Sequence, residues 1–288
     1  MTSDLPCPSE PPDRRRLTLF LVIGFAFSWI VWAPLTISAL RGGAAWPYWH
    51  LLGGLGPAVA GLLVTRLEGE AGWRGLLGRL DPRRTRLSWL AFGALAPVAL
   101  YAIAVVLLGL GGQGWPRLRD FGASREYPEL GRSVYWLANL VFYGLGEEIG
   151  WRGYLLPRLQ RRMGARAAAC VVTVIWALWH LPLFAFAAGM RAMGPAEIVG
   201  WFLSLLTGSF LLTWILNSSG SIVAVALFHG VLDITMGSPG HPMTMNIMGA
   251  LLTVGGIAVA VATGPGLRWP RDGRTGAGED SDGWHARR

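Results

Sequence analysis

Long apolar runs separated by short polar segments make up most of the sequence, and this pattern predicts membrane-spanning helices. Because an α-helix rises about 1.5 Å per residue, roughly 20 apolar residues cross the hydrocarbon core of a bilayer, which is about 30 Å thick. Eight runs approach this length, so we expect an all-α, polytopic transmembrane bundle of about eight helices. The seventh run is short, which leaves a seven-span or re-entrant arrangement open. The runs are Leu17 to Leu40, Trp46 to Thr65, Leu87 to Leu110, Ser133 to Tyr154, Ala167 to Ala188, Pro195 to Leu216, Ile222 to Met236 and Thr244 to Ala262.

The basic residues are all arginine, and they are distributed unevenly between these runs. If the N-terminus lies inside, 18 arginines fall on that side of the membrane, 6 fall on the other, and Arg152 lies within a run. Positively charged short loops tend to stay in the cytoplasm. We therefore expect an even number of spans and a multi-pass protein of the plasma (cytoplasmic) membrane with both termini in the cytoplasm.

The two ends of the chain differ in composition from the middle. Residues 1–16 and 264–288 are polar and rich in proline and glycine, so we expect them to be disordered cytoplasmic segments around a transmembrane domain of residues 17–263. The first apolar run is too long for a signal peptide and predicts a retained span. Small residues around Pro57, from Gly53 to Gly61, predict close helix packing with a kink.

The composition excludes several function classes. Of 288 residues, 52% are hydrophobic and only 15% are charged, below the quarter or so that is usual in soluble proteins. The net charge of +8 does not indicate a nucleic-acid partner, because the arginines lie between apolar runs rather than along one polar surface. The two cysteines, Cys7 and Cys170, form no redox or thiolate zinc motif.

Three apolar runs contain ionisable residues near their centres. A charge at a helix centre costs about 2.5 to 3.5 kcal/mol on insertion scales, so each such residue needs a partner or a function. Glu148 and Arg152 are four residues apart and share a helix face, whereas Glu147 points about 100° away. His229 and Asp233 also share one face. The pattern therefore predicts one neutralising ion pair and one carboxylate without a local partner.

The expected depths of these residues predict a single polar cavity. Counting from the span ends at 1.5 Å per residue places Glu147 and His229 about 10 Å, and His180 about 20 Å, from the cytoplasmic side. We therefore expect a polar cavity that opens toward the cytoplasm. His50 and His241 lie at span edges and His285 lies in the tail, so we expect none of the three to take part.

Three motifs on three separate helices carry a family resemblance. Glu147-Glu148-Ile149-Gly150-Trp151-Arg152 matches an E-E-x-x-x-R motif, Trp176 to His180 matches aromatic-x-x-x-His, and His229 to Asp233 matches His-x-x-x-Asn/Asp. In this order they resemble the CPBP family of intramembrane proteases. That family includes type II CAAX prenyl endopeptidases and bacterial bacteriocin-processing or self-immunity proteins of the lysostaphin-resistance-A type. The motifs cover residues 146–233, and the Gly56-Pro57-Ala58 segment is also similar.

The resemblance implies an eight-helix endopeptidase that acts from the cytoplasmic side on a peptide or membrane-protein substrate. It implies that Glu147 activates water together with His180, and that His229 and Asp233 stabilise the oxyanion. The sequence departs from the family at two positions. Trp176 replaces the more usual phenylalanine and keeps an aromatic wall, whereas an ionised Asp233 in place of asparagine would repel an oxyanion.

Asp233 leaves three roles open. It could be protonated by burial and donate a hydrogen bond, or it could orient His229 by accepting its N–H. Alternatively, Glu147, His180, His229 and Asp233 could hold a metal ion, a donor set that suits Zn²⁺. Both a metalloprotease and a metal-free glutamate mechanism therefore remain open.

The candidate catalytic residues are thus Glu147, His180, His229 and Asp233, with Glu148 and Arg152 as an associated pair. Two other functions compete with proteolysis. One is a non-catalytic membrane immunity or binding protein. The other is a proton-coupled transporter, which would need polar residues continuing to the outer face, and the sixth and eighth runs offer few. No feature of the sequence specifies an isoprenoid pocket or an oligomeric state.

Overall fold

The computed structural model describes residues 14–43, 48–125 and 127–268, and these contain helices and no strand. Five helical stretches among them are long and apolar enough to cross a membrane, namely Arg14–Leu40, Trp49–Leu67, Leu87–Leu110, Pro195–Ser219 and Met243–Ala262. Two shorter apolar helices, Ala165–Trp179 and Ile222–Met236, have 15 residues each. The prediction of a helical, multi-pass membrane bundle is confirmed.

The helix bounds follow the predicted apolar runs with small shifts. The first helix begins at Arg14, so residues 14–16 are helical and not disordered, and Leu267, in the expected tail, is fully buried. Residues 1–13 and 269–288 of the expected tails lie outside the described residues. The helices are α1 (Arg14–Leu40), α2 (Trp49–Gly53), α3 (Gly56–Leu67), α4 (Glu70–Leu80), α5 (Leu87–Leu110), α9 (Ala165–Trp179), α10 (Leu183–Phe186), α11 (Ala188–Arg191), α12 (Pro195–Ser219), α13 (Ile222–Met236) and α14 (Met243–Ala262).

The fourth predicted span is one continuous helical stretch, residues 132–160, with two wider turns inside it. Its segments are α6 (Arg132–Ala138), the π-helix η3 (Asn139–Leu145), α7 (Gly146–Gly150), the π-helix η4 (Trp151–Leu155) and α8 (Leu156–Gln160). In a π-helix each bond reaches five residues back, so side chains rotate relative to those of an α-helix. The side chains of the short α7, which include both glutamates, are therefore rotated relative to the positions that one regular α-helix over residues 132–160 would give them.

The fifth predicted span is shorter than expected. Its helix, α9, ends at Trp179 with His180 as the C-terminal cap, and the chain continues as the short helices α10 and α11. Pro182 explains the break, because its ring removes an N–H and disfavours helical geometry at the preceding residue. His180 consequently stands at the end of a helix and not inside one.

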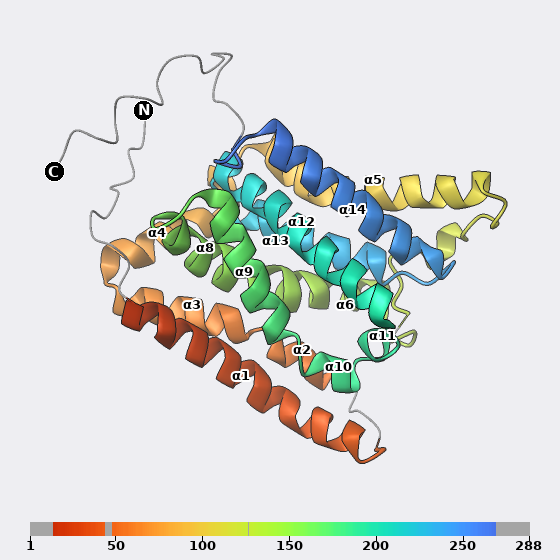
Figure 1. The fold of residues 1–288 in the computed structure, drawn as a ribbon, viewed down its shortest axis with the longest axis horizontal. Helices are drawn as coiled ribbons and strands as arrows, with labels where there is room; N and C mark the ends of the chain where they lie inside the picture. The colour runs from red at the N-terminus through yellow and green to blue at the C-terminus, as the bar shows by residue number, and fades with distance from the viewer. Residues whose placement is uncertain (1–13, 44–47, 126, 269–288) are drawn as a thin grey trace.

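The long helices lie side by side, and the two ends of the bundle differ (Figure 1). α1 packs on α3, α5 packs on α13, and α12 packs on α14. The start of α1 and the ends of α12 and α14 lie at one end of the bundle, whereas α2, α10 and α11 lie at the other. Large aromatic side chains, including Phe20, Trp32, Trp151, Tyr154 and Trp179, fill the interior.

Glycines allow the helix that carries the glutamates to approach α3 closely. A Cβ atom on Gly150 would lie 2.4 Å from the carbonyl oxygen of Pro57, and one on Gly146 would lie 2.8 Å from that of Gly54. The predicted kink is present, because α2 ends at Gly53 and α3 begins at Gly56 with Pro57 in its first turn. Close backbone packing thus fixes the position of α7.

The substitution Gly150→Ala tests this contact. Because the added methyl group meets backbone atoms, we expect a loss of about 1 to 3 kcal/mol in unfolding free energy. Gly200→Ala in α12 is the matched control, since no atom lies within 4 Å of its Cβ position. Detergent-induced unfolding of both variants measures the difference, and equal stability would show that the close contact is unimportant.

Candidate active site

A buried ion pair lies at the centre of the site. Glu148 Oε1 accepts a hydrogen bond of 2.9 Å from Arg152, and both side chains are fully buried. Arg152 also donates to Ser209 Oγ of α12 at 2.9 Å, and its guanidinium lies 4.5 Å from the centre of the Trp176 ring. The prediction of a neutralising pair on one helix face is confirmed.

His229 lies between two carboxylates. Its Nδ1 is 2.8 Å from Glu148 Oε1, and its Nε2 is 3.5 Å from Asp233 Oδ2, one turn further along α13. The indole of Trp176 meets the imidazole edge to face, with ring centres 5.3 Å apart. The ion pair of one helix and the histidine of another are thus joined through Glu148.

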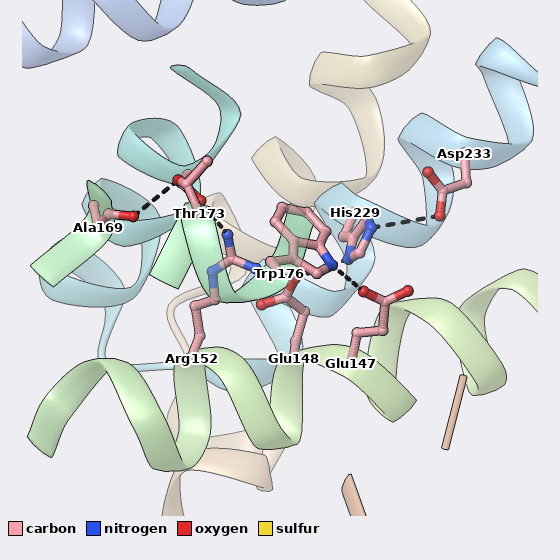
Figure 2. A network of polar contacts seen from close by, with 9 residues as sticks. Glu147, Glu148, Arg152, Ala169, Thr173, Trp176, His229 and Asp233 are labelled. Carbon is pink, nitrogen blue, oxygen red and sulfur yellow. Dashed lines mark hydrogen bonds and ion pairs between the residues drawn. The ribbon is translucent and has the colours of Figure 1, made fainter. Parts of the chain in front are cut away.

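Glu147 points away from this pair, as the helix geometry predicts. Its Oε2 accepts a hydrogen bond of 2.5 Å from Nε1 of Trp176. Figure 2 shows this bond as a dashed line from the indole to Glu147. Glu147 is 3% exposed, so its carboxylate is nearly removed from bulk water. Trp176 therefore holds one oxygen of Glu147 in place.

His180 is oriented by its own helix. Its Nδ1 is 2.7 Å from the carbonyl oxygen of Trp176, so Nδ1 carries the proton in this hydrogen bond and Nε2 remains as the basic nitrogen. Trp179 and Trp201 pack edge to face on the ring, at 4.9 and 5.7 Å between centres.

One cavity of about 310 Å³ brings these residues together. Glu147, His180, His229 and Asp233 all line it, whereas Glu148 and Arg152 lie behind its wall. Most of the remaining lining is apolar or aromatic: Trp176, Trp179, Leu183, Trp201, Leu205, Leu212, Phe228, Leu232 and Leu252.

His50, which sequence analysis sets aside as a span-edge residue, also lines the cavity. Its Nδ1 shares a hydrogen bond of 2.9 Å with the hydroxyl of Tyr127, from the loop after α5. The only sequence signal that His50 lies in the cavity wall is its position beside the small-residue segment at Gly53. The contact with Tyr127 joins residues 77 positions apart, so local pattern does not reveal it.

The cavity and the described chain ends lie in different halves of the bundle. The lining residues come from the middle of the bundle and from the end at which α2, α10 and α11 lie, opposite the start of α1. The sequence predicts that both the chain termini and the cavity opening are on the cytoplasmic side. The side of the membrane on which each lies stays a prediction.

The arrangement does not support the predicted metal set in this conformation. Among the described residues, no three His, Cys, Asp or Glu side chains are placed to share one metal ion. Both nitrogens of His229 already face carboxylates, and His180 offers only Nε2. Binding of Zn²⁺ by Glu147, His180, His229 and Asp233 therefore remains an untested prediction.

Arg152→Leu tests the energetic role of the ion pair. Removing one partner leaves Glu148 as a buried charge, so we expect a loss of about 3 to 5 kcal/mol in unfolding free energy. Arg66→Leu is the matched control, because Arg66 and Glu70 form the same i,i+4 pair at 3.0 Å with side chains 61% and 58% exposed. The control is expected to lose at most about 1 kcal/mol in detergent-induced unfolding. Similar losses in both variants would contradict a special role for the buried pair.

Comparison with known proteins points to one family. Residues 129–235 match the family described as type II CAAX prenyl endopeptidase Rce1-like. A curated relative from Methanococcus maripaludis, named CAAX prenyl protease 2, is 32% identical over 93 residues, which cover 31% of this chain and 34% of the relative. The aligned part thus spans about a third of the relative's length.

The matched segment includes all three motifs and the four candidate residues that line the cavity. The family match and the motif resemblance therefore agree over this segment, which is similar to type II CAAX prenyl endopeptidases.

Proposed function

We propose that the protein is an intramembrane endopeptidase that hydrolyses peptide bonds in the cavity. The observation that carries the proposal is the convergence of Glu147, His180 and His229, from three helices, on one largely apolar cavity. The family match supports the same class of activity. A peptide carbonyl bound there would have a base and a donor within reach and little competing water.

Glu147 is the proposed general base. A carboxylate in an apolar cavity is a stronger base than a solvated one, and a positioned base contributes about 10² to 10⁴ in rate. With Oε2 held by Trp176, Oε1 is free to take a proton from water. The water oxygen then forms a bond to the peptide carbonyl carbon. When the C–N bond breaks, the proton on Glu147 passes to the leaving nitrogen, which gives one carboxylic acid and one amine and restores the carboxylate of Glu147.

The two histidines have different proposed roles. His180, with Nδ1 bonded to a backbone carbonyl, presents Nε2 as an acceptor that orients the attacking water. His229 presents Nε2–H to the oxyanion, because 3.5 Å is too long for a strong hydrogen bond to Asp233. Donors aimed at a developing oxyanion are worth about 10² to 10³ in rate.

Glu148 Oε1, 2.8 Å from Nδ1, is the proposed partner that orients the ring of His229, whereas Asp233 Oδ2 lies 3.5 Å from Nε2 and leaves that nitrogen to the oxyanion. The role of Asp233 among the three possibilities stays open. No step of the proposed mechanism passes through a metal ion.

The proposed substrate is a peptide or a membrane protein. The name of the Methanococcus relative refers to CAAX prenyl proteins. For this chain we limit the proposal to peptide bonds next to apolar side chains, because the cavity lining is largely apolar.

Glu147→Gln tests the proposed base. We expect it to lose about 10² to 10⁴ in cleavage rate, since an amide cannot take a proton from water. New protein termini in the membranes of cells expressing the wild type, absent with Glu147→Gln at matched expression, would establish the activity and identify the substrate. The exposed Glu70→Gln is the matched control and should retain the new termini. Identical termini with wild type and Glu147→Gln would instead favour a non-catalytic binding or immunity function.

Trp176→Phe tests how Glu147 is positioned. The substitution keeps an aromatic ring against His229 and Arg152 but removes the N–H bonded to Oε2. A hydrogen bond to a charged group contributes about 1.5 to 3 kcal/mol, so we expect about a tenfold or greater loss in kcat. Because the lost hydrogen bond also stabilises the fold, thermal unfolding in detergent is measured in parallel and kcat is compared at a temperature at which both proteins are folded. A stable variant with wild-type kcat would show that the indole does not position the base.

A further inference from the structure

The residues that line the cavity show in which half of the bundle the cavity lies. Leu183, Ala187 and Met190 come from the segment after α9, and Met236 is the last residue of α13. His50 comes from α2, at the start of the second span. All of these lie at the end of the bundle where Figure 1 places α2, α10 and α11. Of the other lining residues, Phe228 and Leu252 lie near the middle of their helices, and Leu212 lies seven residues before the end of α12.

The opposite end of the bundle is closed by packed side chains. Arg158 donates from Nε to Glu68 at 2.9 Å, and its terminal nitrogen pairs with the same carboxylate. Tyr154 donates to Glu68 at 3.1 Å, and Arg79 donates to the carbonyl of Gly153 at 2.9 Å. None of these four side chains lines the cavity. The lining of the cavity therefore does not reach this end, where these side chains pack between α3, α4 and α8.

The closed end is also the arginine-rich end. Among the described residues, fourteen arginines lie there, in the first turn of α1, around α4, between α8 and α9, and after α14. Six arginines lie at the cavity end: Arg41, Arg117, Arg119, Arg125, Arg132 and Arg191. Arginine-rich short loops stay in the cytoplasm, so the closed end is the cytoplasmic one.

We propose that the cavity opens on the extracytoplasmic side of the membrane and takes apolar peptide segments presented from that side. The side of opening follows from the fold and the charge distribution alone. The substrate class rests on the proposed function. Its apolar character follows from Trp201, Leu205 and Leu252, which line the cavity beside the catalytic residues.

Single cysteines at the two ends of the bundle test the side of opening. In a background with Cys7→Ser and Cys170→Ser, Gly189→Cys places a thiol on α11 at the cavity end, and Gly164→Cys places one between α8 and α9. No atom lies within 4 Å of either Cβ position, so both substitutions fit the fold. A membrane-impermeant maleimide is added to intact cells and, separately, to detergent-permeabilised cells.

We expect Gly189→Cys to react in intact cells and Gly164→Cys to react only after permeabilisation. The reverse pattern would overturn the proposal. Reaction of both thiols in intact cells would show two orientations and would contradict it equally, as would a failure of Gly189→Cys to react before permeabilisation.

Oriented vesicles separate the side of opening from the proposed catalysis. The probe is a set of water-soluble, quenched fluorescent octapeptides with apolar central residues. It is added to right-side-out and inside-out vesicles that contain the wild type or Glu147→Gln. We expect cleavage only in right-side-out vesicles with the wild type. Cleavage confined to inside-out vesicles would overturn the side of opening. No cleavage in either orientation, together with the expected thiol pattern, would overturn the substrate class and the proposed function but leave the orientation standing.

Discussion

A buried charge pair inside a membrane bundle must be satisfied, and this requirement shapes the site. Glu148 and Arg152 are fully buried on one helix face, where an unpaired charge would cost several kcal/mol. Satisfying the pair fixes the rotation of the helix about its axis. With Glu148 turned toward Arg152 and His229, Glu147 must face a different direction, which is the cavity. Ser209 of α12 accepts a second hydrogen bond from Arg152 and joins a third helix to the same centre.

The sequence predicted those features that depend on helix geometry within one element. Four-residue spacing placed Glu148 beside Arg152 and His229 beside Asp233, and both contacts are present. The end of α9 at Trp179 was missed because apolar character continues past Pro182, although the proline breaks the helix. The place of His50 in the cavity wall was missed for another reason, because it depends on a contact with Tyr127, which is 77 positions away in the sequence.

The two ends of the bundle differ in their proposed roles, which are structural at one end and chemical at the other. At the arginine-rich end, Arg158 pairs with Glu68 and Arg79 donates to the carbonyl of Gly153. Toward the other end, glutamate and histidine side chains face a cavity with a largely apolar wall. Trp176 connects the central ion pair to this cavity, because its ring covers Arg152 while its N–H holds Glu147. A single helix, α9, thus supports the buried ion pair, orients the proposed base and presents His180.

The two adjacent glutamates have separate proposed roles, one chemical for Glu147 and one structural for Glu148. Thermal unfolding and peptide cleavage measured in parallel for Glu147→Gln and Glu148→Gln test this division. We expect Glu147→Gln to unfold like the wild type but not to cleave, because only the base is lost. We expect Glu148→Gln to unfold at a clearly lower temperature, because Arg152 loses its buried counter-charge. Cleavage by Glu147→Gln, or equal destabilisation of the two variants, would contradict the division of roles.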